Sequence, residues 1–172
     1  MIVVSDTTPL ITLMKANQLQ LLHTLFGEVR IPVTVYEELT SNQSFQSEIE
    51  LIRSSSFIKI VSVQNQQAVT LIGRVTGLDK GETEAIVYAD EQKADILLMD
   101  EAAGRKVARN MGLTITGSIG ILMEAYQRDV LSRREYEKAI HDIRVSNRHI
   151  SERLLNLALQ MMDGSHADEP AH

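Results

Sequence analysis

Four acidic residues are placed along the chain so that folding could bring them together: Asp6, Glu38, Glu82 and Asp100. Asp6 and Asp100 each follow a short apolar run that predicts a buried strand. Because the functional crevice of an open parallel sheet lies outside the carboxyl ends of its strands, we expect both carboxylates at that edge. Glu38 and Glu82 lie on predicted helices that can lean over the same edge.

Metal binding is the chemistry that such a cluster predicts. Two carboxylates about 4 Å apart repel each other by about 4 kcal/mol at an effective dielectric of about 20, so four of them need a cation. The chain has no cysteine and no close pair of histidines. Hard oxygen ligands alone favour Mg²⁺ or Mn²⁺. A divalent ion held in this way can activate water and stabilise an in-line displacement at a phosphodiester.

Each acid can also be interpreted as an ordinary structural residue. Asp6 begins the segment Asp-Thr-Thr-Pro, and an aspartate in this position is well suited to cap a helix. Glu38 lies beside Glu37, and one member of such a pair on a surface helix is usually solvated. The four positions together, rather than any single acid, therefore indicate a site.

Two of the four positions have a neighbouring acid that could replace them. Glu82 and Glu84 both suit the first turn of a helix, where the helix dipole favours negative charge. Asp100 and Glu101 compete for one position, because either of them could begin the next helix. We predict Glu82 and Asp100 as ligands and keep Glu84 and Glu101 as reserves.

The elements that must position these acids alternate between strands and helices. Strands are expected at 2–4, 29–31, 57–63, 96–99 and 113–116, and helices at 9–14, 19–26, 32–39, 46–54, 82–93, 101–111, 118–128, 134–143 and 150–162. This alternation predicts a three-layer α/β sandwich with a central, mainly parallel sheet. We expect an α/β domain over 1–130, a helical extension packed on it over 131–162, and a disordered tail over 163–172.

Composition excludes several classes of protein. The 172 residues include no cysteine, which excludes disulfides, thiolate zinc sites, iron–sulfur clusters and a cysteine nucleophile and fits a cytoplasmic protein. The first residues do not form a signal peptide, and no apolar stretch reaches the ~18–20 residues that span a bilayer. A P-loop, a dinucleotide-binding motif and a Gly-x-Ser-x-Gly elbow are missing. A phosphoaspartate-type domain with Asp6 as nucleophile would need a lysine after a late strand, where this chain has Ser118.

The sequence resembles the PIN-domain family from Val3 to about Met162, and five segments carry the resemblance. They are Val3–Ile11, Ile31–Leu39, Leu78–Ile86, Leu97–Arg105 and Gly117–Leu122. In the second segment the family's acid comes six residues after the proline, which favours Glu38 over Glu37. The last three segments are similar to an uncharacterised branch of the family. Two departures matter, because Glu82 stands where many members have aspartate, and Met99-Asp100-Glu101 replaces the usual Thr-x-Asp.

The resemblance implies a function as well as a fold. It implies a Mg²⁺- or Mn²⁺-dependent ribonuclease, often the VapC-like toxin of a toxin–antitoxin pair with a small antitoxin protein, and usually a homodimer. The expected supporting residues are Thr7 and Ser118 beside the carboxylates or metal waters, and Arg105, Lys106 and Arg109 beside RNA phosphates. As an alternative to contacting RNA, these three basic residues would simply form a solvated face of their helix. The alternative for the whole chain is a catalytically weak or inactive PIN scaffold that binds nucleic acid or protein.

The distribution of charge leads to a first prediction. The chain carries 17 basic and 23 acidic side chains, a net charge of −6, which opposes charge-driven binding of nucleic acid. Three of the acids lie in the predicted tail and four are the proposed ligands. We therefore expect RNA to bind poorly without a divalent ion and measurably better with Mg²⁺, as fluorescence anisotropy of a labelled single-stranded RNA would show. Equal affinity in EDTA and in Mg²⁺ would contradict this.

Overall fold

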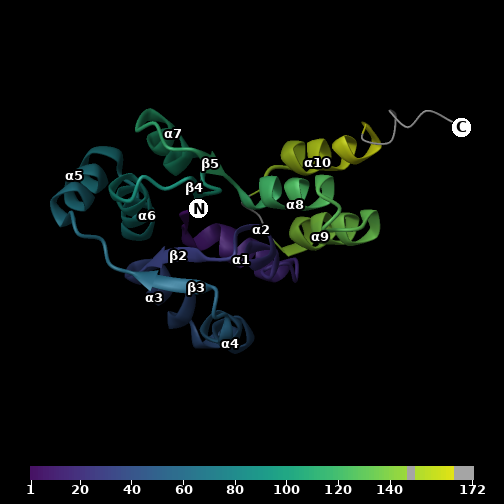
Figure 1. The fold of residues 1–172 in the computed structure, drawn as a ribbon, viewed down its shortest axis with the longest axis horizontal. Helices are drawn as coiled ribbons and strands as arrows, with labels where there is room; N and C mark the ends of the chain where they lie inside the picture. The colour runs from purple at the N-terminus through teal and green to yellow at the C-terminus, as the bar shows by residue number, and fades with distance from the viewer. Residues whose placement is uncertain (147–149, 165–172) are drawn as a thin grey trace, which may run out of the picture.

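A five-stranded sheet in which all paired strands run parallel lies at the centre of the computed structural model, which describes residues 1–146 and 150–164 (Figure 1). The strands are β1 (Val3–Ser5), β2 (Val29–Pro32), β3 (Ile58–Val61), β4 (Ile96–Leu98) and β5 (Ile115–Thr116). Their order is β3-β2-β1-β4-β5. This arrangement confirms the predicted α/β fold with a parallel sheet.

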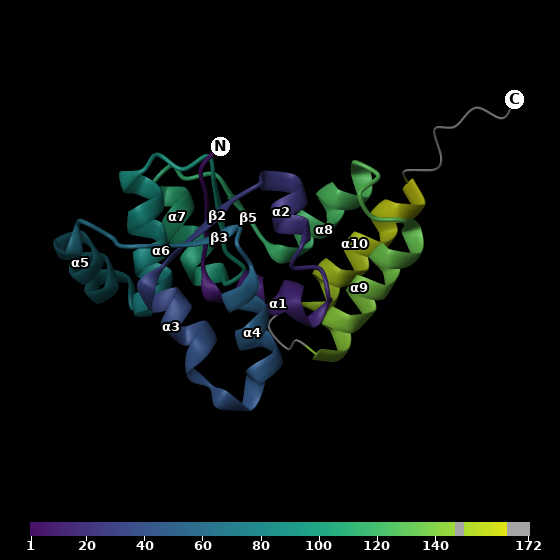
Figure 2. The same ribbon diagram turned by 60° about the horizontal axis from the view of Figure 1, so that its bottom comes forward.

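Helices cover both faces of the sheet. They are α1 (Thr7–Lys15), α2 (Leu21–Phe26), α3 (Val33–Ser41), α4 (Gln46–Ser54), α5 (Gln66–Thr76), α6 (Lys80–Glu91), α7 (Ala102–Asn110), α8 (Ser118–Gln127), α9 (Arg133–Ser146) and α10 (Glu152–Gly164), with a short 3₁₀ turn at Gln43–Phe45. Figure 2 shows α5, α6 and α7 gathered on one side and α8, α9 and α10 on the other. Helix α3 contacts both α1 and α6.

The alternation of side chains along the strands divides the core into two clusters. Val3 and Leu98 pack with the apolar residues of α1, α2, α8, α9 and α10. Val4, Leu97 and Met99 pack with those of α6 and with Val69 of α5 and Ala108 of α7. Because successive strand residues point to opposite faces, two neighbouring strands of three residues each are enough to anchor both helical layers.

Helices α5 and α6 and strand β3 are among the elements that differ from the sequence-based expectation. Helix α5 was not predicted, although its apolar residues Ala68, Leu71, Ile72 and Val75 recur at helical spacing. Val69 is its single buried residue. Helix α6 begins at Lys80, in a segment expected to be a loop, because the Asp79 side chain caps it. Strand β3 is shorter than expected, since it lies at the edge of the sheet and pairs with β2 over four residues.

Helices α9 and α10 close the C-terminal part of the described chain. The buried Tyr136 hydroxyl on α9 donates to the Ala158 carbonyl of α10 at 2.9 Å. The Tyr136 ring stacks on that of Tyr126 of α8, with the ring centroids 4.8 Å apart. Asp163, expected in the tail, belongs to α10 and pairs with Arg133 at 3.0 Å. Gly164 also belongs to α10, and the rest of the predicted tail, 165–172, lies outside the described residues. No helix in the described ranges has the length and apolarity needed to cross a membrane.

Candidate functional site

The candidate site lies where the order of the strands reverses. From β1 the chain proceeds to β2 and β3 on one side, and later adds β4 and β5 on the other. In such sheets the crevice at this switch point, outside the carboxyl ends of the strands, is the usual ligand site. A cavity of about 310 Å³ lies there, which we call the acidic cavity. Its lining residues are Asp6, Thr7, Thr8, Glu38, Asp79, Glu82 and Glu101.

Asp6 is the most deeply buried acid of this cavity. It is 2% exposed, and its amide donates to the Leu98 carbonyl at 3.0 Å, which ties the end of β1 to β4. Asp6 occupies the N-cap position of α1, yet its side chain makes no capping hydrogen bond to any described residue. The pKa of Asp6 is raised to about 7, mainly by burial and further by the charges of Glu82, Asp79 and Glu38, against a hydrogen bond from the Thr7 amide that lowers it. Asp6 therefore has the backbone position of a helix N-cap, but its side chain does not cap the helix.

Glu38 reaches the acidic cavity from α3. The Thr7 hydroxyl donates to its Oε2 at 2.5 Å, so Thr7 contacts a carboxylate of the cavity. A Cβ at Gly81 would lie 2.5 Å from Glu38 Oε1, so a larger residue in the first turn of α6 would displace this carboxylate. Burial raises the pKa of Glu38, with further contributions from the charges of Asp79 and Glu84. Of the adjacent pair of glutamates, Glu38 is the one that lines the cavity.

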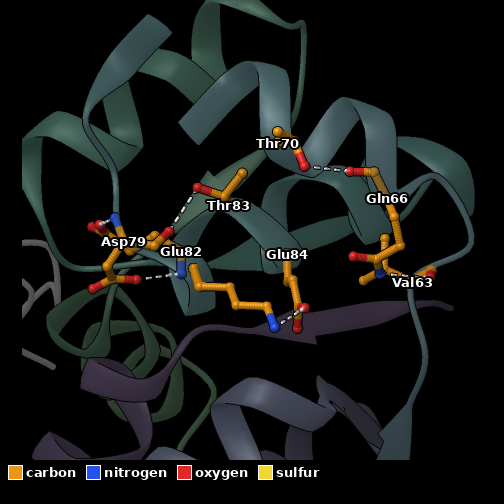
Figure 3. Close-up of polar contacts among 8 residues, drawn as sticks. Val63, Gln66, Thr70, Asp79, Glu82, Thr83 and Glu84 are labelled. Atoms are coloured by element: carbon orange, nitrogen blue, oxygen red, sulfur yellow. Dashed lines mark hydrogen bonds and ion pairs between the residues drawn. The ribbon is translucent and has the colours of Figure 1, made fainter. Parts of the chain in front are cut away.

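Glu82 and Asp79 hold each other at the start of α6 (Figure 3). The Glu82 amide donates to Asp79 Oδ1 at 2.8 Å, and the Asp79 amide donates to Glu82 Oε2 at 3.2 Å, which forms a capping box. The other oxygen, Glu82 Oε1, lies 3.2 Å from where a Cβ of Gly104 would be. Burial raises the pKa of Glu82, and Asp79, Glu101 and Glu38 add to it. Glu82 thus caps the helix and lines the cavity at once.

Asp79 was not among the predicted site residues. It lines the acidic cavity, and its charge raises the pKa values of Asp6, Glu38 and Glu82. The sequence contained a signal for it, because an aspartate followed three residues later by a glutamate is the pattern of a capping box.

The reserve ligand Glu84 does not line the acidic cavity. It is buried and pairs with Lys80 at 3.8 Å (Figure 3).

The two competing acids after β4 point to different places. Asp100 Oδ1 accepts from the Ser118 amide at 2.7 Å, and its Oδ2 accepts from the Ser118 hydroxyl at 2.9 Å. Burial raises the pKa of Asp100 even though these hydrogen bonds and Arg105 oppose the shift. Glu101 lines the acidic cavity. The structure therefore places Glu101, the reserve ligand, with the other acids of the cavity. The Asp100 carboxylate is instead hydrogen-bonded to Ser118, the first residue of α8.

The three basic residues predicted to contact RNA lie on α7. Arg105 is half-buried, and its Nη1 donates to the Met99 carbonyl at 2.7 Å, so it holds the end of β4. Burial lowers the pKa of Arg105, and the nearby charge of Arg109 lowers it further. Lys106 and Arg109 are exposed. Contact of these residues with phosphate stays a prediction.

The chemistry of the donor set fits a hard divalent cation. Five of the seven lining residues are acids, and no lysine or arginine is among the described residues that line the cavity. Carboxylates that raise each other's pKa gain stability when a cation neutralises them. Within the described ranges, however, no three acids or histidines are already close enough together to hold a metal ion. Ion binding would therefore require small movements of these side chains.

Comparison with known proteins matches the chain to a family. A family model described as a PIN domain matches residues 2–164. The match covers all five strands and every residue that lines the acidic cavity. No curated protein matches the chain.

The burial of Asp6 predicts how the stability of the metal-free protein depends on pH. Asp6 binds its proton more tightly in the folded protein, with a pKa of about 7, than at its ordinary 3.8. The free energy of unfolding should therefore fall as pH rises between these values, by up to about 4 kcal/mol. Asp6→Asn should remove most of this fall, and Glu50→Gln, at an exposed position of α4, should keep it. Urea unfolding in EDTA measures both, and an unchanged pH dependence in Asp6→Asn would contradict the prediction.

The divergence of Asp100 and Glu101 predicts different effects for their alanine variants. Asp100→Ala should destabilise the protein by about 1–3 kcal/mol, because it leaves the buried Ser118 donors unsatisfied. Glu101→Ala should weaken Mn²⁺ binding with a smaller loss of stability. Calorimetric titration with Mn²⁺ and urea unfolding distinguish the two. A greater loss of Mn²⁺ affinity in Asp100→Ala would instead make Asp100 the ligand.

Proposed function

The chain belongs to the PIN-domain family, whose members are generally nucleases, and on this premise we propose that it hydrolyses RNA phosphodiester bonds with Mg²⁺ or Mn²⁺. The observation that carries the proposal is the acidic cavity at the carboxyl edge of the sheet, lined by five acids. The negative charge of this cavity would repel a negatively charged substrate such as RNA unless a cation were bound between the acids and the substrate.

The residues proposed to hold the cation are Asp6, Glu38 and Glu82, with the fourth position taken by Asp100 or, as the geometry favours, by Glu101. A bound divalent ion would supply an activated water and neutralise charge that develops on the phosphoryl oxygens. The chain itself supplies the positioning. Thr7 orients the Glu38 carboxylate, and the capping box fixes that of Glu82.

Hydrolysis in this cavity would proceed by in-line attack of water at phosphorus. The 3′-oxygen would be the leaving group, so the products would carry 5′-phosphate and 3′-hydroxyl ends. The exposed basic side chains of Lys106 and Arg109, on the neighbouring α7, are suited to contact flanking phosphates. Such contacts orient the strand without reading its sequence.

The wider biological setting is also a proposal. Family resemblance supports the toxin of a toxin–antitoxin pair, a small antitoxin partner, a homodimer and a cytoplasmic location. A short gene directly beside this one would support the toxin role.

A second candidate function is a PIN scaffold that binds nucleic acid or protein without efficient catalysis. Two observations favour it. The described residues contain no ready-made group of metal ligands, and the third acidic position is Glu82, whose longer side chain is already engaged in the capping box. This candidate predicts binding of RNA or of a protein without cleavage under any divalent ion.

Cleavage of a single-stranded RNA in Mn²⁺ or Mg²⁺ tests the nuclease proposal. Asp6→Asn and Glu38→Gln should each reduce the rate by about a hundredfold or more, a loss of about 2.7 kcal/mol of transition-state stabilisation. Glu37→Gln is the matched control, since it removes the adjacent exposed carboxylate and should leave the rate unchanged. Full activity in Asp6→Asn, with contaminating nuclease excluded, would refute the metal mechanism, whereas no cleavage with any divalent ion would favour the scaffold.

A further inference from the structure

A second cavity, of about 540 Å³, adjoins the acidic cavity and is larger than it. Glu101 lines both cavities. The second cavity lies between α7, β5, α8 and the start of α10, and its volume is within the ~300–1,000 Å³ typical of small-ligand sites. A substrate whose phosphate lies in the acidic cavity would therefore extend into the second cavity with its next group.

The walls of the second cavity differ in character. Met123 of α8, Ile150 just before α10 and Leu154 of α10 provide an apolar surface. Asp100, Arg105 and Thr116 provide polar groups. A flat apolar ring with a hydrogen-bonding edge matches this combination, and the bases of single-stranded RNA are rings of that kind. The acidic cavity has no comparable apolar wall, since its lining consists of acids and threonines.

Arg105 gives the second cavity a fixed positive charge. Its hydrogen bond to the Met99 carbonyl and its partial burial hold the guanidinium in place before any ligand arrives. A planar guanidinium that is held in this way can stack on a base or donate to its edge at little entropic cost. Lys106 and Arg109 on the same helix make the surroundings favourable for a polyanion.

We propose that the second cavity binds the base of a nucleotide next to the scissile phosphodiester and so gives the enzyme a base preference. This inference rests on the proposed function for the orientation of the strand. Binding of a nucleotide in the second cavity, however, requires no cleavage and can be measured separately.

Nuclear magnetic resonance of protein labelled with ¹³C at the methionine methyl groups tests the proposal directly. The chain has seven methionines, Met123 lines the second cavity, and Met123→Leu assigns its signal. The probes are the 5′-monophosphates of adenosine, guanosine, cytidine and uridine, added in Mg²⁺. At least one should shift the Met123 methyl signal saturably. Ribose 5-phosphate, which has the phosphate and sugar without the base, should leave that signal in place.

A pair of tryptophan variants on α10 provides the matched control. Leu154 lines the second cavity and is 41% exposed, whereas Leu157, 50% exposed, does not line it. Leu154→Trp should fill the cavity and weaken nucleotide binding by about tenfold or more, as expected for the loss of one base contact. Leu157→Trp should bind as the parent protein does. Mn²⁺ should raise the melting temperature of both variants as much as that of the parent protein, because neither residue lies in the acidic cavity.

The outcomes separate this inference from the proposed function. If no nucleotide shifts the Met123 signal, or if ribose 5-phosphate shifts it equally, the second cavity is not a base site. If Leu154→Trp and Leu157→Trp weaken binding equally, the site lies elsewhere. If nucleotides bind as predicted but no RNA is cleaved, the base site stands and the nuclease proposal fails.

Discussion

Repulsion among carboxylates is the constraint on which the rest of this structure depends. Asp6, Glu38, Asp79, Glu82 and Glu101 line one cavity of about 310 Å³, and several of them raise each other's pKa. Neutral donors restrain the acids at three points: the Thr7 hydroxyl on Glu38, the Thr7 amide on Asp6 and the Asp79 amide on Glu82. Each restraint comes from the start of a helix, where free amides and the helix dipole tolerate negative charge.

The sheet makes this arrangement rigid. Three residues of β1 pair with three of β4, and the two faces of these strands are buried in separate apolar clusters. A shift of one residue in this register would exchange the two faces and expose core side chains to the wrong helical layer. The position of Asp6 relative to the turn after β4 is therefore held by burial on both faces of the sheet.

Sequence reasoning located the parts of the site that follow from periodicity. The apolar runs before Asp6 and Asp100, and the proline-led helix that carries Glu38, predicted the edge at which the acids meet. It did not determine which way the side chains point in the turn after β4, because Asp100 and Glu101 differ by one residue and the outcome depends on Ser118, 18 residues later. Helix α5 was missed even though its apolar residues recur at helical spacing, and two of them, Leu71 and Val75, are exposed.

The glycine at position 81 has a consequence for how this protein would lose its site over time. The missing side chain leaves room for the Glu38 carboxylate, and any larger residue would displace that carboxylate while every acid stayed in the sequence. A descendant could therefore retain all five acids and still hold the Glu38 carboxylate in a different position. Residue 81 therefore bears on the geometry of the centre alongside the five acids.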